Sequence, residues 1–311
     1  MKEPANQQTV LLTGATSQLG VFLIPRLLTE GFRVLALSRK ASGRPPDPGA
    51  SLGWIHPDTL DMGADNSSST ISRGVDILVS CGPVELAVKA VKVCSDLERV
   101  VIFSTSSVFS KAGSADPVEN DQIADILGGE AELSACCGEA GLALLYLRPT
   151  LIYGCGLDRN ISRLAAWIRR HGWLPLAGQA TGLRQPVHAD DLAEVAVRAL
   201  LADPPLTLDS PACGGSTISY QHMAELIFDS LNKPRRIIGV PPGVLTALTG
   251  LVAKLPAFHG LNREMVRRQN TDLVFDDSPL REALDYNPRP FQPASEDYEI
   301  PSCAMNYRLP D

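Results

Sequence analysis

The sequence lacks the long apolar segments and the concentrated basic charge that mark membrane-spanning and nucleic-acid-binding proteins. Its polar start, MKEPANQQTV, has no signal-peptide core, and no uncharged apolar run approaches the roughly 18 residues that span a bilayer. Its 28 Lys and Arg residues are scattered and are outnumbered by 35 Asp and Glu, for a formal net charge of −7. We therefore expect a cytoplasmic protein with no nucleic-acid partner and no stable membrane insertion.

One apolar segment comes nearest to a membrane-binding element. It runs from Val240 to Phe258, but Lys254 interrupts it and prolines bracket it. We interpret this segment as a buried helix or a lid helix. The alternative is a face that touches lipid or a lipid-linked substrate.

Patterns for metal binding and for disulfide bonds are also missing. The seven cysteines are odd in number and none has the Cys-x-x-Cys spacing, and the histidines show no ligand spacing. We therefore expect free thiols in a reducing compartment and no metal site.

The chain does contain apolar residues in quantity, 44% of the total, against 20% charged residues. Strand-like apolar runs alternate with helical patterns through its first half, which is typical of a parallel sheet with helices on both faces. The sequence therefore predicts an α/β fold with a doubly wound parallel sheet. We expect strands at 9–13, 33–38, 52–55, 76–80, 100–104 and 142–149, and helices near 18–30, 83–96, 117–139, 160–171, 190–202 and 219–231.

The turn after the first strand has the pattern of a dinucleotide site. It reads TGATSQLG, in which Gly14 permits a tight turn and Gly20 permits close packing of helix on strand. Ser17 stands where such a turn usually has glycine, and its hydroxyl can donate to a phosphate oxygen. Since the turn opens a helix within a βαβ unit, we predict that its backbone and the helix N-terminus bind a pyrophosphate. The predicted contacts are Gly14, Thr16, Ser17, Gln18, Leu19 and Gly20.

The end of the second strand predicts which cofactor is bound. A carboxylate that would hold a ribose 2′-hydroxyl is absent there, and Ser38 is followed by the cations Arg39 and Lys40. A guanidinium pairs with a 2′-phosphate through two N–H donors, so NADP(H) is predicted to bind in preference to NAD(H). The alternative is a solvated basic pair at a strand end.

Several segments together resemble a known family. They are TGATSQLG, the hydroxyl-rich STSSVF after the strand at 100–104, LRPTLIYGCG at 147–156, RQPVHADDLAEVAVRAL at 184–200 and NTDLVFDDSPLREALDYNPRPF at 270–291. In this order and spacing the chain resembles the extended short-chain dehydrogenase/reductase superfamily, the NAD-dependent epimerase/dehydratase proteins. The resemblance implies a Rossmann-type domain (1–152 plus 189–215), a smaller C-terminal substrate-binding domain (153–188 plus 216–311), nucleotide-sugar substrates and a possible homodimer.

The resemblance also implies roles for single residues. Thr105 matches the Ser or Thr that hydrogen-bonds the reacting hydroxyl, and Ser106 follows it as a substrate contact. Asp58, with Asp61 close by, matches the acidic residue that holds adenine. The remaining residues that we assign to the cofactor on this basis are Gly82, Ser104, Arg148, Pro149 and Thr150.

The usual proton-transfer pair of that family is missing. A Tyr with a Lys four residues later is expected in the helix after the hydroxyl strand, but none of the six tyrosines has such a lysine. General base catalysis is typically worth about 10² to 10⁴ in rate, so a replacement is needed or the chemistry is different or absent. Lys111 is the leading replacement, and Tyr153, Glu119 and Asp121 are weaker ones.

Basic and amide groups gather in the segment that resembles a substrate pocket wall. We predict substrate contacts from Asn160 and from Arg184, whose guanidinium could hold a diphosphate. The alternative role of Arg184 is a surface or interdomain ion pair. His188, Asp190 and Asp191 could suggest an acid–base cluster. We instead interpret one of the two aspartates as a helix N-cap in a segment that joins the domains.

Two functional hypotheses follow. The first is an NAD(P)-dependent epimerase, dehydratase or reductase with a non-standard active site, acting on a nucleotide sugar or a related polar substrate. The second is a non-catalytic NADP(H)-binding sensor or scaffold subunit that has kept the cofactor turn and lost the base. Fold alone does not separate them.

Overall fold

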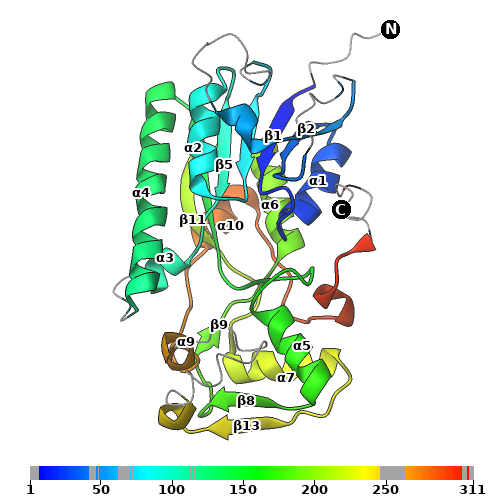
Figure 1. Ribbon diagram of the computed structural model, residues 1–311, viewed down its shortest axis with the longest axis vertical. Helices are drawn as coiled ribbons and strands as arrows, with labels where there is room; N and C mark the ends of the chain where they lie inside the picture. The colour runs from blue at the N-terminus through cyan, green and yellow to red at the C-terminus, as the bar shows by residue number, and fades with distance from the viewer. Residues whose placement is uncertain are drawn as a thin grey trace.

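A seven-stranded parallel sheet forms the larger half of the molecule, called here the sheet half (Figure 1). The computed structural model describes residues 7–302 and 307, apart from 42–46, 48, 62–70, 72, 112–113, 115 and 246–262. The strand order is β11-β6-β5-β4-β1-β2-β3, so the chain reverses direction across the sheet between β1 and β4. The strands are β1 (Thr9–Thr13), β2 (Arg33–Leu37), β3 (Leu52–Ile55), β4 (Ile77–Ser80), β5 (Arg99–Phe103), β6 (Ala143–Pro149) and β11 (Leu208–Ala212).

Helices cover both faces of this sheet, which is why its strands are apolar without alternation. Helices α2 and α4 pack on one face through a core that includes Ala87 and Leu133. Helices α1, α6 and α10 pack on the other face, through Leu23, Leu192 and Leu280 among others. The helical elements of this half are α1 (Gly20–Thr29), η1 (Pro57–Leu60), α2 (Val84–Val93), α3 (Ser107–Ser110), α4 (Pro117–Ala140), α6 (Ala189–Leu201) and α10 (Ser278–Leu284).

The smaller half lies beyond the carboxyl ends of the strands (Figure 1). Its core includes Tyr153, Trp167 and Phe228, and its strands form three short pairs, β7–β10, β9–β12 and β8–β13. Its strands are β7 (Ile152–Tyr153), β8 (Leu174–Ala177), β9 (Leu183–Arg184), β10 (Val187–His188), β12 (Ile218–Ser219) and β13 (Ile237–Val240). Its helices are α5 (Ile161–His171), α7 (Tyr220–Ser230), α9 (Arg263–Arg268) and η3 (Ser295–Tyr298).

The predicted fold class is confirmed, and the predicted strands and helices lie within a few residues of their positions in the structure. The predicted domain boundaries stay a prediction, except at one segment. The predicted smaller domain (153–188 plus 216–311) includes helix α10. In the structure, however, Leu280 and Leu284 of α10 lie in the core between α6 and the sheet. We therefore place α10 in the sheet half.

Helices long and apolar enough to cross a membrane do not occur among the described residues. The apolar segment from Val240 to Phe258 lies mostly outside them, because residues 246–258 are not described. The described cysteines, six of the seven, are free thiols. Clusters of His, Cys, Asp or Glu suited to a metal ion are likewise absent from the described part of the chain.

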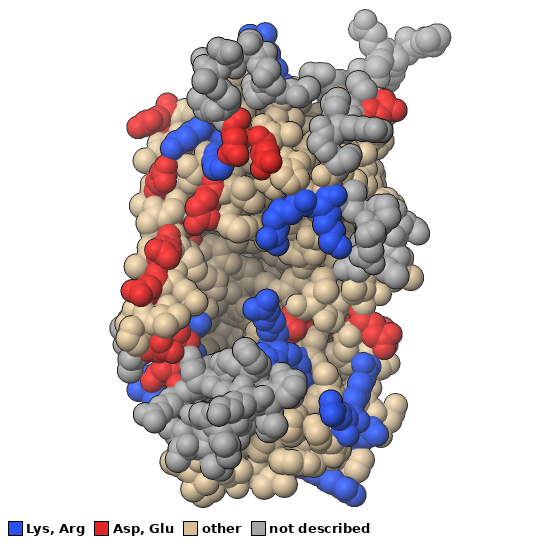
Figure 2. Space-filling view, in the orientation of Figure 1, with Lys and Arg blue, Asp and Glu red and all other residues tan. Residues whose placement is uncertain are grey.

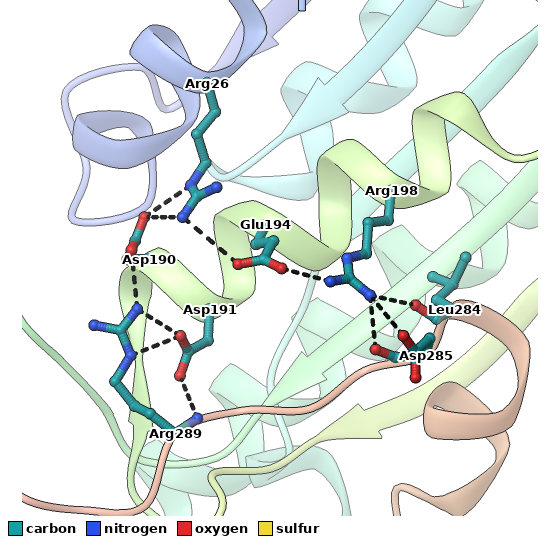
Figure 3. A network of polar contacts seen from close by, with 8 residues as sticks. All are labelled: Arg26, Asp190, Asp191, Glu194, Arg198, Leu284, Asp285 and Arg289. Atoms are coloured by element: carbon teal, nitrogen blue, oxygen red, sulfur yellow. Dashed lines mark hydrogen bonds and ion pairs between the residues drawn. The ribbon is translucent and has the colours of Figure 1, made fainter. Parts of the chain in front are cut away.

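A network of charged side chains joins α1, α6 and the C-terminal segment (Figure 3). Arg26 of α1 donates to Asp190 over 2.8 Å, and Arg289 donates to Asp190 over 2.9 Å and to Asp191 over 2.7 Å. These aspartates occupy the first turn of α6 and are not its N-cap, which corrects that interpretation. The N-cap is His188, whose Nδ1 accepts a hydrogen bond from the amide of Asp190.

Candidate functional site

The glycine turn between β1 and α1 is compact because two of its glycines leave no space for a side chain. Gly14 has φ of +64°, and a Cβ there would lie 2.7 Å from the amide nitrogen of Gly82 and closer still to the carbonyl of Cys81. A Cβ on Gly20 would overlap the carbonyl of Ala15. The turn therefore lies against the residues that follow β4, at the point where the strand order reverses. Dinucleotides bind at such a point in doubly wound sheets.

The other residues of the turn differ in what they offer. Ser17 Oγ accepts a hydrogen bond from the amide of Gly20, and Thr16 is exposed. Leu19 is buried in the core, so only its backbone could contact a ligand. Gln18 lines the larger cavity described below, and its buried Oε1 has no hydrogen-bond partner among the described residues. A buried acceptor without a donor is costly, which favours a ligand at this position.

The residues predicted to select the cofactor lie after β2 and in η1. Arg39 and Lys40 are exposed, whereas Ser38 is buried and its hydroxyl accepts from the amide of Lys40. Asp58 is exposed and pairs with His56. Its neighbour Asp61 pairs with Lys89 of α2.

A cavity of about 520 Å³ lies between the carboxyl edge of the sheet and the smaller half. Figure 2 shows it as a hollow in the middle of the face, with basic side chains on its border. It brings together eight residues that the sequence predicted for cofactor, catalysis or substrate. They are Gln18, Thr105, Ser106, Lys111, Glu119, Thr150, Asn160 and Arg184.

Thr105 lines this cavity and also a second one of about 310 Å³ beside it. The second cavity lies between β5, α2 and α4 and is lined by Gly82, Ser104 and apolar side chains such as Ile102 and Ile126. Thr105 Oγ1 accepts a hydrogen bond from the amide of Ser107 over 3.1 Å. Because that bond uses a lone pair, the hydroxyl hydrogen of Thr105 is available to donate to a ligand.

Arg148 is held in a buried ion-pair network. Its guanidinium donates to both carboxylate oxygens of Glu130 over 3.0 and 2.8 Å, and to Asp209 over 2.6 and 2.8 Å. Burial works against the charged form, but these hydrogen bonds outweigh it and raise the pKa of Arg148 above its ordinary value. Ser104 also belongs to the network, since it donates to Glu130 and accepts from Arg148. The side chain of Arg148 is therefore engaged within the protein, and neither cavity is lined by it.

Lys111 lies beside a second buried ion pair, which joins the two halves. Glu119 of α4 accepts from both terminal nitrogens of Arg268 in α9 over 2.7 and 2.8 Å, and Lys111 Nζ lies 3.5 Å from the same carboxylate. The hydrogen bonds from Arg268 lower the pKa of Glu119 to about 2. Glu119 is therefore a poor base, and the ammonium of Lys111 is partly neutralised by it.

Tyr153 and Asp121, the other two candidates for a general base, do not line the larger cavity. Tyr153 is buried, packs edge to face on His188 and Phe291, and has its pKa raised by burial. Asp121 lies on the exposed side of α4. A carboxylate that sequence reasoning did not single out, Asp158, does line the larger cavity. Its carboxylate accepts hydrogen bonds from the amides of Asn160 and Ser162, at the N-terminus of α5.

Arg184 is buried in the wall of the larger cavity without an ion-pair partner among the described residues. Its guanidinium donates to the carbonyls of Leu183, Arg268 and Thr271 and lies 5.5 Å from the ring centre of Tyr220. Burial lowers its pKa. Within the described part of the chain Arg184 thus forms no ion pair between the halves, and a buried cation in a cavity wall favours an anionic ligand.

Besides Asp158, sequence reasoning missed four residues of this region: Glu130 and Asp209, which hold Arg148, and Tyr220 and Arg268, which line the larger cavity near Arg184. The sequence carries no motif for them. Tyr220 directly follows β12, which pairs with β9, the strand of Arg184. Its position near Arg184 could have been predicted only if that pairing had been known.

No family model matches the chain. Uncharacterized protein y4nG of Sinorhizobium fredii is 25% identical over 309 residues, which cover 91% of this chain and 75% of that protein. An uncharacterized protein of Mycobacterium tuberculosis is 27% identical over 256 residues, 80% of this chain, and the chain spans only 26% of its length. The mitochondrial NADH dehydrogenase [ubiquinone] 1 alpha subcomplex subunit 9 of Arabidopsis thaliana is 26% identical over 144 residues, which cover 43% of this chain and 36% of that subunit.

Solved structures match over nearly the whole chain. UDP-N-acetylglucosamine 4-epimerase from Bacillus cereus has a TM-score of 0.67 at 16% identity and covers 98% of both chains. MoeE5 in complex with UDP-glucuronic acid and NAD has a TM-score of 0.64 at 20% identity and covers 91% of this chain and 94% of its own. The predicted Rossmann-type fold is thereby confirmed: the chain shares its fold with these two solved proteins over nearly its whole length.

Proposed function

We propose that the chain is an NAD(P)-dependent epimerase-, dehydratase- or reductase-like protein that binds a nucleotide sugar in the larger cavity. One observation carries the proposal. A single cavity has the Thr105 hydroxyl on the wall from the sheet half and the unpaired cation Arg184 on the wall from the smaller half. A hydroxyl donor at one end and a cation at the other suit a ligand with a polar sugar and a diphosphate. Solved proteins of this fold hold UDP-glucuronic acid or UDP-glucose together with NAD.

The residues of the sheet edge fit a nicotinamide dinucleotide. The glycine turn excludes side chains at Gly14 and Gly20, and the buried Oε1 of Gln18 lacks a donor among the described residues. The turn, with Gly82 beside it, would hold the pyrophosphate, and Arg39 would pair with the 2′-phosphate of NADP(H). When bound, this cofactor supplies a hydride acceptor and donor. Pro149 is buried at the end of β6, and Thr150 beside it lines the larger cavity.

The chain's own residues would orient the substrate and exclude water. Thr105 would donate a hydrogen bond to the reacting hydroxyl or carbonyl, and Arg184 would hold the diphosphate at the far end. Leu157, Leu273 and Phe275 line the cavity and exclude water from it. Lys111, paired with Glu119, is suited to donate a hydrogen bond or a proton, since an ammonium is not itself a base.

A second candidate function is a non-catalytic NADP(H)-binding sensor or scaffold subunit. One observation favours it: α4, where the usual base would stand, contains neither Tyr nor Lys. Its buried Glu130 is held in an ion pair with Arg148 and also accepts from Ser104, so this carboxylate is engaged within the protein. The cytoplasmic location and the homodimer remain predictions under both functions.

Native mass spectrometry of the whole chain with a panel of UDP-sugars and with NADP(H) or NAD(H) tests both candidates. Binding of cofactor and sugar together, followed by a changed sugar, would establish the enzyme. Tight NADP(H) binding without conversion of any sugar would favour the sensor. A chain that binds neither dinucleotide would contradict both.

The same measurement tests the cofactor preference. Arg39→Ala should weaken NADP(H) binding about tenfold or more, the worth of a charge-assisted hydrogen bond, and leave NAD(H) binding unchanged. Lys233→Ala is the matched control, because Lys233 is exposed and lines neither cavity. Equal affinity for both cofactors in the unmodified chain would contradict the preference.

A further inference from the structure

Tyr220 lies beside Arg184 in the wall of the larger cavity. It is the first residue of α7 and directly follows β12, which pairs antiparallel with β9 through Ile218 and Arg184. This pairing places the two side chains together. The guanidinium carbon of Arg184 lies 5.5 Å from the centre of the Tyr220 ring, and both residues line the larger cavity.

Both groups keep hydrogen-bond donors that the described residues do not use. Arg184 meets only neutral carbonyl oxygens, and no carboxylate among the described residues pairs with it. The hydroxyl of Tyr220 has no hydrogen-bond partner in the described part of the chain, although the side chain is half-buried. Because both residues line the cavity, their remaining donors are accessible to an acceptor on a ligand.

The pair is suited to an anion with several oxygens. Burial raises the pKa of the Tyr220 phenol, so the hydroxyl keeps its proton at neutral pH and can donate it in a hydrogen bond. The aromatic face beside the guanidinium favours the charged form and restricts its rotation. The wall therefore presents an O–H donor and N–H donors side by side. The two carboxylates that line the same cavity have other partners, since Asp158 accepts from the amide of Ser162 and Glu119 pairs with Arg268.

We propose that Tyr220 contacts the ligand of this cavity directly, and that its hydroxyl donates a hydrogen bond to a phosphate oxygen of the nucleoside diphosphate that Arg184 holds. This inference rests on the proposed function. It assigns to the smaller half a second contact for the diphosphate, and it makes Tyr220 a determinant of affinity for the phosphate part of the substrate.

The test is calorimetric titration of the whole chain with UDP, inorganic pyrophosphate and uridine. Tyr220→Phe keeps the ring beside Arg184 and removes only the hydroxyl, which has no partner among the described residues, so the variant should fold normally. Its affinity for UDP and for pyrophosphate should fall about tenfold, the typical worth of one hydrogen bond to a charged group. Its affinity for uridine should be unchanged.

Tyr298→Phe is the matched control, because it also loses one phenolic hydroxyl, but that hydroxyl bonds to Ser230 and Tyr298 does not line the cavity. Its affinity for UDP should equal that of the unmodified chain. Normal UDP affinity in Tyr220→Phe would overturn the inference and leave the proposed function standing. A loss seen with uridine as well as UDP would overturn the phosphate assignment. Failure of the unmodified chain to bind UDP would overturn the proposed function, and the inference with it.

Discussion

Gly14 is confined to glycine by two separate constraints. Its backbone is left-handed, and a Cβ would also collide with the backbone of Cys81 and Gly82 on the neighbouring strand end. The first constraint arises within the turn and the second from the packing of β1 beside β4. Both must hold for the turn to present its amides at the sheet edge.

We expect Gly14→Ala to destabilise the fold by about 3 kcal/mol or more and to abolish dinucleotide binding, since a methyl group there displaces backbone. Gly141→Ala separates the two constraints. Gly141 has φ of +68° at the end of α4 with nothing within 4 Å of its Cβ position, so it should lose only about 1 kcal/mol. Urea denaturation of both variants checks this, and equal losses would contradict the packing argument.

The sequence predicted the turn conformation at Gly14 but not the ion pairs of Arg148. The glycine has a local signature, because its neighbours in the chain form the turn. Arg148 lies near the end of β6, and its ion pairs are with Glu130, 18 residues earlier, and with Asp209, 61 residues later. Long-range partners of that kind leave no pattern near the residue itself.

Helices α4 and α9 are joined across the larger cavity by Glu119 and Arg268. The pair is bidentate and both side chains are nearly buried, at 8% and 14% exposure. It connects the sheet half to the smaller half directly beside Lys111. Because the folded-state pKa of Glu119 lies below its ordinary value, its charged form contributes stability that is complete above the ordinary pKa and is lost as the pH falls toward the folded value.

Glu119→Gln should therefore destabilise the chain by about 3 kcal/mol near pH 7, since one pKa unit corresponds to about 1.4 kcal/mol. The difference from the unmodified chain should shrink as the pH falls from about 5 toward 2. Urea denaturation across that range measures it. Glu132→Gln, in an exposed pair with Lys92, should change stability by less than about 1 kcal/mol. A difference for Glu119→Gln that does not depend on pH would contradict the assignment.

Elements of different length were predictable to different degrees. The strands of the main sheet could be predicted because they are buried on both faces and appear as continuous apolar runs. The two-residue strands β7, β9, β10 and β12 could not, because only pairing with a distant segment makes them strands. Arg184 and Tyr220 meet through one such pair, which is why their contact escaped sequence reasoning.

Over the whole molecule, the network of Figure 3 ties the C-terminal segment to two helices of the sheet half. Arg289 carries most of it, through its bonds to Asp190 and Asp191. Asp191 is nearly buried, so removal of the guanidinium would leave a carboxylate short of partners.

Arg289→Met should lower stability by about 1 to 2 kcal/mol, a value reduced because Arg289 itself is half-exposed. It should also make the segment after Asp285 more sensitive to limited proteolysis. Arg235→Met, which removes an exposed ion pair with Asp229 in the smaller half, should change both measurements little. Unaltered proteolysis of Arg289→Met would show that the segment is held by other contacts.

The placement of α10 has a consequence for how this chain can be divided. The sheet half is assembled from residues before Leu151, from α6 and β11, and again from α10, and the segments between them build the smaller half. The chain thus crosses between the halves repeatedly, and no single cut yields a fragment that carries the glycine turn alone in a finished core. A fragment that ended before Ser278 would uncover the surface that Leu280, Leu284 and Tyr286 now fill. The glycine turn and the cavity wall that contains Arg184 therefore cannot be separated by truncation at any one position without opening a core.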